Sequence, residues 1–143
     1  MSVAEIEHLT NVFTLAIGDR DTLRFDVRGR VIELREAVNY RLKGSKYVRT
    51  LPDTPYPTIS EEKLLKAIDD ALSAWTLINA ATNVENFTPP LLLRGGYSQA
   101  NFQNDSTALR QAFMAVTTAE NELRLARGHR DDLLKAFLDR MVS

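Results

Sequence analysis

The sequence predicts an all-α protein, an elongated antiparallel bundle of three long helices, and two observations carry this prediction. Apolar residues recur at helical spacing in at least three segments, and the prolines are confined to positions 52–57 and 89–90. One short stretch, 23–28, alternates apolar and charged residues like a strand, but no second strand exists for it to pair with. We therefore expect well over half of the residues to be helical.

The last third of the chain, from Ser98 to Met141, is the predicted longest helix, with Ser98 as its N-cap. Its apolar residues recur at intervals of three, four and seven, which is the spacing of one helical stripe. The stripe keeps its phase across Gly128, so we expect no break there. It consists of Leu109, Phe113, Val116, Leu123, Ala126, Leu133, Leu134, Phe137 and Met141.

Two helical segments, 2–17 and about 20–43, precede the first prolines, and Ser2 with Glu5 predicts a capping box at the start. The residues around Gly18 predict that the first long helix is kinked or broken there. We favour a kink in a continuing helix, because the apolar stripe runs on across this point. The alternative is a four-helix up-and-down bundle, in which the two segments are separate helices.

Residues 44–58 contain three prolines and predict a connector, with Gly44 ending the preceding helix. The next predicted helix covers about 59–84, with Thr58 or Ser60 as its cap and Trp75 as its main buried anchor.

Residues 85–97 form an apolar loop, because a Pro-Pro pair excludes a helix and three leucines follow it. A loop this apolar is not expected to stay in water, so we predict that at least two of the leucines at 91–93 are buried. The longest helix, about 66 Å, exceeds its neighbours by roughly 27–30 Å. A loop running along residues 2–17 would remove that offset, and a second subunit covering the overhang is the alternative.

The composition limits the classes of function. The chain of 143 residues has a net charge of −1 and suits one helical domain, 1–143. The absence of cysteine excludes disulfides, thiolate metal sites and cysteine nucleophiles. No apolar run is long enough to span a membrane, and the start does not resemble a signal peptide. We expect a cytoplasmic protein, and the interpretation as an excised domain stays open.

No catalytic signature is present, so we expect no enzyme, no cofactor and no metal. Glu5-x-x-His8 has metal-ligand spacing, but a di-iron bundle needs two such motifs, and Ala126 stands where His129 would need a carboxylate. Gly-x-Ser-x-Gly, P-loop and dinucleotide-binding motifs do not occur.

The sharpest surface feature is the basic stretch 40–49, which has four cations, two tyrosines and no acid. Cations interleaved with aromatics suit phosphate contacts and base stacking. The favoured interpretation is structural, because cations are common at helix C-termini, where they offset the dipole. The candidate anion-binding residues are Tyr40, Arg41, Lys43, Lys46, Tyr47 and Arg49.

Two further groups of polar residues, one of arginines and one of asparagines, are interpreted as structural rather than functional. Five arginines alternate with acids and predict an intrahelical ion-pair lattice: Arg20, Arg24, Arg28, Arg30 and Arg35. Five asparagines near the apolar loop are interpreted as caps and turns rather than a polar pocket: Asn79, Asn83, Asn86, Asn101 and Asn104.

The leading hypothesis is a non-enzymatic structural or interaction module that acts through coiled-coil-like helical faces and forms a homo-oligomer. Its partner is another protein or a second copy of itself. The predicted interface residues are Leu91, Leu92, Leu93, Leu133, Phe137 and Met141. The alternative is an anion or nucleic-acid binder that uses the stretch 40–49. A third option is a ligand-binding sensor or enzyme with a pocket near residues 86–104.

Overall fold

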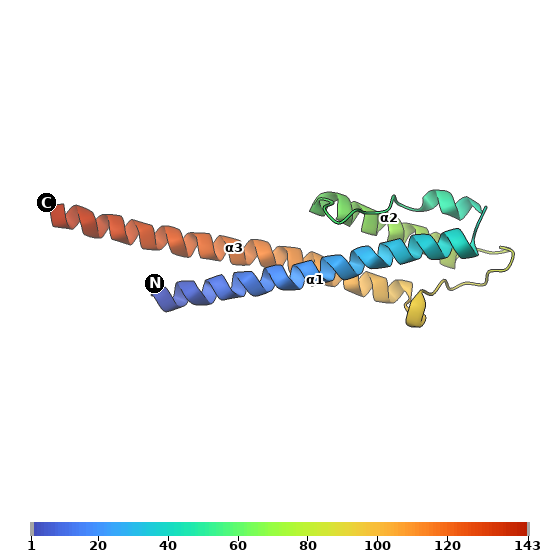
Figure 1. Cartoon of the computed structure of the whole chain (residues 1–143), viewed down its shortest axis with the longest axis horizontal. Coiled ribbons are helices and arrows are strands. Elements are labelled where there is room, and N and C mark those ends of the chain that lie inside the picture. Colours follow the sequence, from blue (N-terminus) through green and yellow to red (C-terminus); the bar gives the residue numbers. More distant parts are fainter. Residues whose placement is uncertain (1, 143) are drawn as a thin grey trace. The chain divides into compact units, whose positions relative to one another are not determined.

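The computed structural model describes residues 2–142 and shows an all-α protein that is 78% helical (Figure 1). Its long helices are α1 (Val3–Arg41), α2 (Glu61–Asn79) and α3 (Gln99–Val142). Two 3-10 helices, η1 (Lys46–Thr50) and η2 (Arg94–Gly96), lie in the connections, and no strand occurs in the described chain. The predicted all-α class with three long helices is confirmed. The chain forms two compact units.

Helix α1 is continuous through Gly18, so a break at this point is wrong, and so is the four-helix alternative. A single glycine costs a helix only about 1 kcal/mol relative to alanine, and the apolar period continues on both sides. The Ser2 hydroxyl accepts a hydrogen bond from the Glu5 amide at 3.2 Å, which is one of the two hydrogen bonds of the predicted capping box. At the other end the chain turns at Gly44, whose φ of 78° is readily adopted only by glycine.

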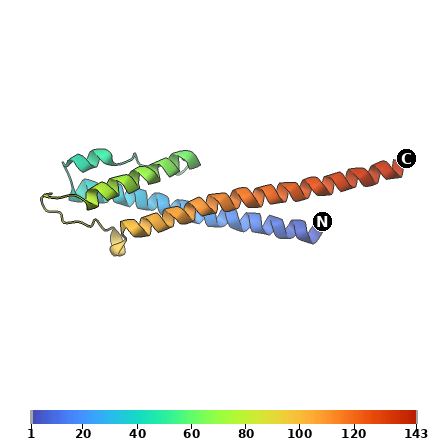
Figure 2. The same ribbon diagram turned by 180° about the vertical axis from the view of Figure 1, so that it is seen from behind.

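The first unit consists of the residues up to Thr22 and those from Arg110 onward. Here the start of α1 lies beside α3, and α3 continues past the start of α1 (Figure 1 and Figure 2). Ile6, Leu123 and Ala126 form a buried cluster, and Leu9 and Phe13 pack against it. These residues lie on one face of each helix, so the predicted stripes meet each other.

The second unit is Leu23–Leu109, and α2 supplies the centre of its core. Ser60 caps α2 by accepting a hydrogen bond from the Lys63 amide at 3.3 Å. Trp75 is fully buried, as predicted, and its ring contacts the rings of Phe102 and Tyr97 at centroid separations of 5.8 and 6.4 Å. The buried face of α2 contains Leu64, Ala67, Ile68, Ala71, Ala74, Trp75 and Ile78.

The apolar loop belongs to this second unit, and α2 holds it. The Trp75 indole N–H donates to the Leu91 carbonyl at 2.9 Å, and the Leu91 amide donates to Asn79 Oδ1 at 2.9 Å. Leu91 and Leu93 are buried and Leu92 is 41% exposed, so the predicted burial of two leucines is confirmed. The predicted path along residues 2–17 is wrong, because the polar groups that fix the loop backbone are on α2.

The proline-rich connector lies along α1 and explains three of the five arginines. Arg28 Nε donates to the Pro55 carbonyl at 2.7 Å, and Arg35 donates to the Pro52 carbonyl at 2.7 Å. Arg24 donates to the carbonyl of Ile59. The predicted ion-pair lattice is therefore wrong for these three side chains, which bind backbone carbonyls instead. Arg20 and Arg30 do pair within the helix, with Asp21 and Glu33.

Helix α2 ends at Asn79, five residues before the predicted boundary. Asn83 and Asn86 adopt left-handed backbone conformations, φ 59° and 60°, which asparagine tolerates better than most residues. Asn101 Oδ1 accepts hydrogen bonds from the amide and hydroxyl of Ser98, the N-cap of α3. Asn83, Asn86 and Asn101 thus serve turns and a cap, as interpreted from the sequence, whereas the Asn79 side chain binds the Leu91 amide of the apolar loop.

Candidate interaction surfaces

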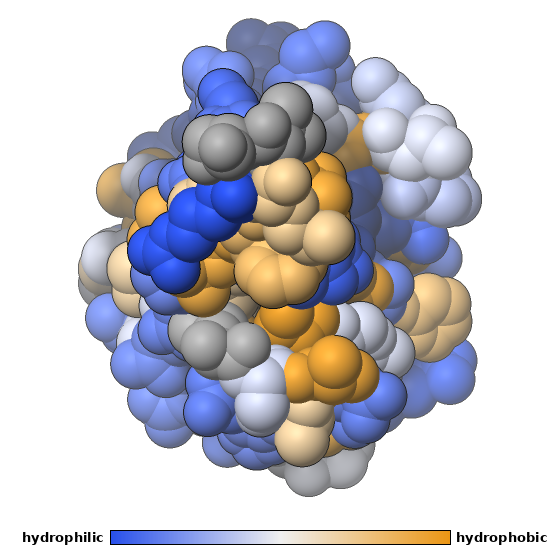
Figure 3. Space-filling view, turned by 90° about the vertical axis from the view of Figure 1, so that its left-hand side faces the viewer, coloured by the Kyte–Doolittle hydropathy of each residue, from blue (hydrophilic) through white to orange (hydrophobic). Residues whose placement is uncertain are grey.

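A group of exposed apolar side chains lies near the end of α3, in the first unit. From Leu133 to Met141, five apolar side chains are between 51 and 69% exposed. They are Leu133, Leu134, Phe137, Leu138 and Met141. Figure 3 looks onto this end of the molecule and shows apolar surface bordered by hydrophilic residues. We call these five residues the apolar tail.

The apolar tail continues the buried stripe of the same helix. Leu133 follows Ala119 and Ala126 at steps of seven residues, and Phe137 lies fourteen residues after Leu123. Ala119, Leu123 and Ala126 are buried, whereas none of the described side chains beyond Ala126 is. The apolar pattern of the stripe therefore continues beyond Ala126, but its described side chains there are exposed.

Charges of both signs flank the apolar tail. Residues 127–141 include four cations and three aspartates, in addition to His129. Arg130 and Asp131 lie 3.6 Å apart and are both largely exposed, so they form a weak surface pair. A surface with this nearly balanced charge can approach a copy of itself without strong repulsion.

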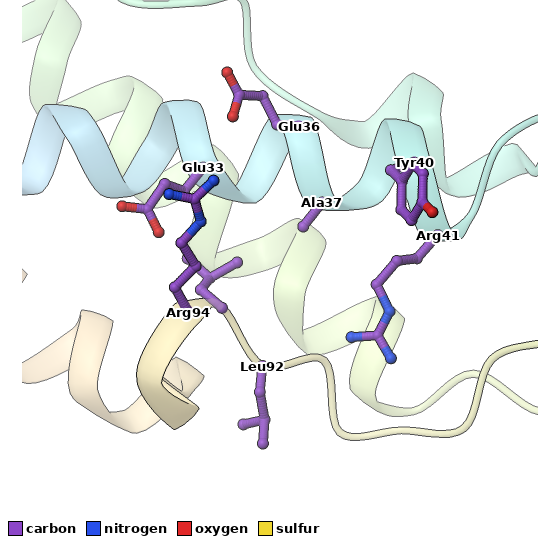
Figure 4. Close-up of a pocket in the computed structure, with 8 residues that line it drawn as sticks. Glu33, Glu36, Ala37, Tyr40, Arg41, Leu92 and Arg94 are labelled. Carbon is purple, nitrogen blue, oxygen red and sulfur yellow. The ribbon is translucent and has the colours of Figure 1, made fainter.

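A second candidate surface is a hollow of about 300 Å³ in the second unit, between α1 and the apolar loop. The lining residues of α1 recur at helical spacing, and the opposite wall is the short segment 92–94 (Figure 4). The lining residues are Glu33, Glu36, Ala37, Tyr40, Arg41, Leu92, Leu93 and Arg94. Tyr40 is 87% exposed, so a large aromatic ring stands at the rim.

A stacked, hydrogen-bonded group supports one end of this hollow. The Arg30 guanidinium lies 3.9 Å from the centroid of the Tyr97 ring and pairs with Glu33 at 3.3 Å. The Tyr97 hydroxyl donates to Asp105 at 2.6 Å. Burial raises the pKa of Tyr97 well above its usual range, and the hydrogen bond to Asp105 and that carboxylate's negative charge raise it further. Tyr97 is therefore neutral at physiological pH and fixes the position of Arg30.

The structure divides the predicted basic stretch 40–49 between three pieces of backbone. Tyr40 and Arg41 belong to the last turn of α1 and line the hollow, and the Arg41 guanidinium lies 5.5 Å from the centroid of the Phe87 ring. Lys43 is exposed in the following turn. In η1, Lys46 lies 5.6 Å from the Tyr47 ring, and Arg49 is exposed.

The predicted interface residues fall into a buried group and an exposed group. Leu91 and Leu93 are core residues of their own chain, whereas Leu133, Phe137 and Met141 are exposed. Leu134 and Leu138 of the apolar tail were not among the predicted interface residues, although Leu134 belongs to the predicted stripe. Sequence reasoning also missed Arg94 as a lining residue, and its one signal was its position directly after the three leucines of the apolar loop.

Comparison of the chain with protein-family models, with curated proteins and with solved structures finds no match. In the part of the chain that the structure describes, no helix has the length and apolar character needed to cross a membrane.

Proposed function

We propose that the protein is a non-enzymatic interaction module that self-associates through the apolar tail of α3. The observation that carries this proposal is the unbroken phase of the α3 stripe. From Phe113 to Ala126 the stripe is buried, and from Leu133 to Met141 the same stripe is exposed. Monomeric proteins rarely leave contiguous apolar surface of this kind in water, and such surface commonly marks a protein contact.

A helix is the partner shape that the exposed stripe fits. Within the chain, Leu123 and Ala126 are covered by Ile6, Leu9 and Phe13 of α1, which are themselves spaced as a helical face. A partner helix that packs along the exposed part of the stripe would extend this packing toward Met141.

A second copy of the chain supplies such a helix. In a two-fold pair the same patch serves both partners, so each apolar tail covers the other. The mixed charges around the tail, including Asp131 and Lys135, leave no field of one sign to oppose the approach.

The test is the solution mass as a function of protein concentration for the intact chain and for two variants, Leu134→Asp and Phe137→Asp. We expect the intact chain to show a concentration-dependent increase in mass. Burying one such side chain contributes roughly 1.5–3 kcal/mol, so either variant should weaken association by at least about tenfold.

The matched control is Leu125→Asp, which also replaces an exposed leucine of α3, at 71% exposure. Leu125 lies off the stripe, so this variant should associate as the intact chain does. Equal weakening by Leu125→Asp would show nonspecific hydrophobic association. A strictly monomeric intact chain at all concentrations would contradict the proposal.

A further inference from the structure

We propose that the hollow between α1 and the apolar loop binds a small organic anion with an apolar or aromatic body, through Arg41 and Arg94. This site is independent of the apolar tail, because all its lining residues belong to the second unit. Its volume, about 300 Å³, lies at the lower end of the range for small-molecule pockets.

Two guanidinium groups on different elements face this hollow. Arg41 extends from the last turn of α1 toward the loop, and Arg94 extends from η2 toward α1 (Figure 4). Both residues are exposed. A guanidinium is planar and presents paired N–H donors, which match the geometry of a carboxylate or phosphate.

Of the two acids in the lining, Glu33 lies on the same side of the hollow as Arg94 (Figure 4). Glu33 is paired with Arg30, so its carboxylate is already shared with another cation. The Glu36 carboxylate turns away from the loop wall and from the space between the walls (Figure 4). The hollow therefore has positive charge at two separate places, with the Arg94 guanidinium on the side of Glu33 and the Arg41 guanidinium near the opposite end (Figure 4).

The remaining lining residues favour a ligand with an apolar body. Ala37 has a small side chain that leaves room beside α1, and Leu93 contributes buried apolar surface. Tyr40 offers a free ring face at the rim, which suits stacking on an aromatic group. Inorganic phosphate alone would use the guanidinium groups and leave these apolar groups without a partner.

The experiment is titration calorimetry of the intact chain with four probes: phenyl phosphate, phenylacetate, inorganic phosphate and phenylethanol. We expect at least one of the two aromatic anions to bind more tightly than both inorganic phosphate and the neutral alcohol. Tighter binding of phenyl phosphate or of phenylacetate supports the proposal in either case and identifies the preferred headgroup. Absence of binding by both aromatic anions would overturn it.

Variants locate the binding. Arg94→Gln and Arg41→Gln should each weaken the favoured anion by about tenfold or more, because each removes hydrogen bonds between charged groups. Ala37→Leu should also weaken it, because the larger side chain fills the hollow without changing any charge. Melting temperatures of all three variants identify any that unfold, and Arg94, being exposed, is the substitution least expected to disturb folding.

The matched controls are Lys43→Gln and Arg49→Gln, which remove exposed cations of the same basic stretch that do not line the hollow. Both should keep the affinity of the intact chain. If they weaken binding as much as Arg94→Gln does, the anion is attracted by the general charge of the stretch, and the pocket proposal is wrong. Unchanged affinity in a folded Ala37→Leu variant would contradict it as well.

Discussion

Arg24, Arg28 and Arg35 lie on one side of α1 and bind backbone carbonyls of the proline-rich connector. Proline has no backbone N–H and breaks regular helices, so a segment rich in it leaves carbonyl groups without the partners that a helix would supply. The guanidinium groups satisfy these carbonyls and fix the connector against the helix. Such long polar side chains cover backbone and contribute packing through their aliphatic parts, so their role goes beyond charge.

Tyr97 carries the clearest pH dependence in the chain. Burial, followed by the hydrogen bond to Asp105, raises the pKa of Tyr97 in the folded protein above that of an exposed tyrosine, near 10. Its stabilising effect is fully present below pH about 10, because the unfolded chain is then also neutral at this residue. As the pH rises beyond that value, the unfolded state ionises first and the folded protein loses stability.

We therefore predict that part of the phenolate absorbance appears only well above pH 10 when the folded protein is titrated with base. The variant Tyr97→Phe should remove this late part. Asp105→Asn removes the negative charge and should shift the late part toward lower pH. A titration curve that is unchanged by Tyr97→Phe, apart from a uniform decrease, would contradict the assignment.

The helices themselves follow from local signals, and this is why the sequence predicts them well. Apolar spacing, capping residues such as Ser2, Ser60 and Ser98, and Gly44 as a stop are all properties of neighbouring positions. Helix α2 ends before the predicted boundary, since its last predicted turn contains Asn83, whose left-handed backbone conformation does not fit a helix.

The predictions that failed depend on contacts between distant segments. Arg28 has acids nearby in the sequence, yet its partner is the carbonyl of Pro55, twenty-seven positions away. Leu91 and Leu93 are buried as predicted, but the place where the loop lies depends on its hydrogen bonds to Trp75 and Asn79. For the same reason the hollow could not be predicted, since only the tertiary fold places Arg41 and Arg94 in the lining of one hollow.

The continuity of α1 can be tested at Gly18. A Cβ at this position would meet nothing within 4 Å, and the residue is exposed within a regular helix. Gly18→Ala should therefore raise the free energy of unfolding by about 0.5–1 kcal/mol, because alanine loses less backbone entropy in a helix. Urea unfolding followed by circular dichroism measures the change.

The matched control is Gly44→Ala, which also has free space but a φ of +78°. Alanine is strained in that conformation, so this variant should lower the free energy of unfolding by about 1 kcal/mol. A destabilising effect of Gly18→Ala would show that α1 is interrupted at Gly18 in solution.

Stability and association are separable properties of the whole molecule, because they depend on different parts of α3. The stripe of α3 is buried up to Ala126, and the described side chains beyond it are exposed. Deletion of residues 131–143 leaves one helical turn after Ala126 and removes the apolar tail. We expect this shortened chain to keep the melting temperature of the monomeric intact protein and to lose the concentration-dependent increase in mass. Thermal unfolding at several protein concentrations, together with light scattering, measures both quantities. If the shortened chain melts at a lower temperature at every concentration while the masses of both proteins agree, the tail stabilises its own chain and the self-association proposal is wrong.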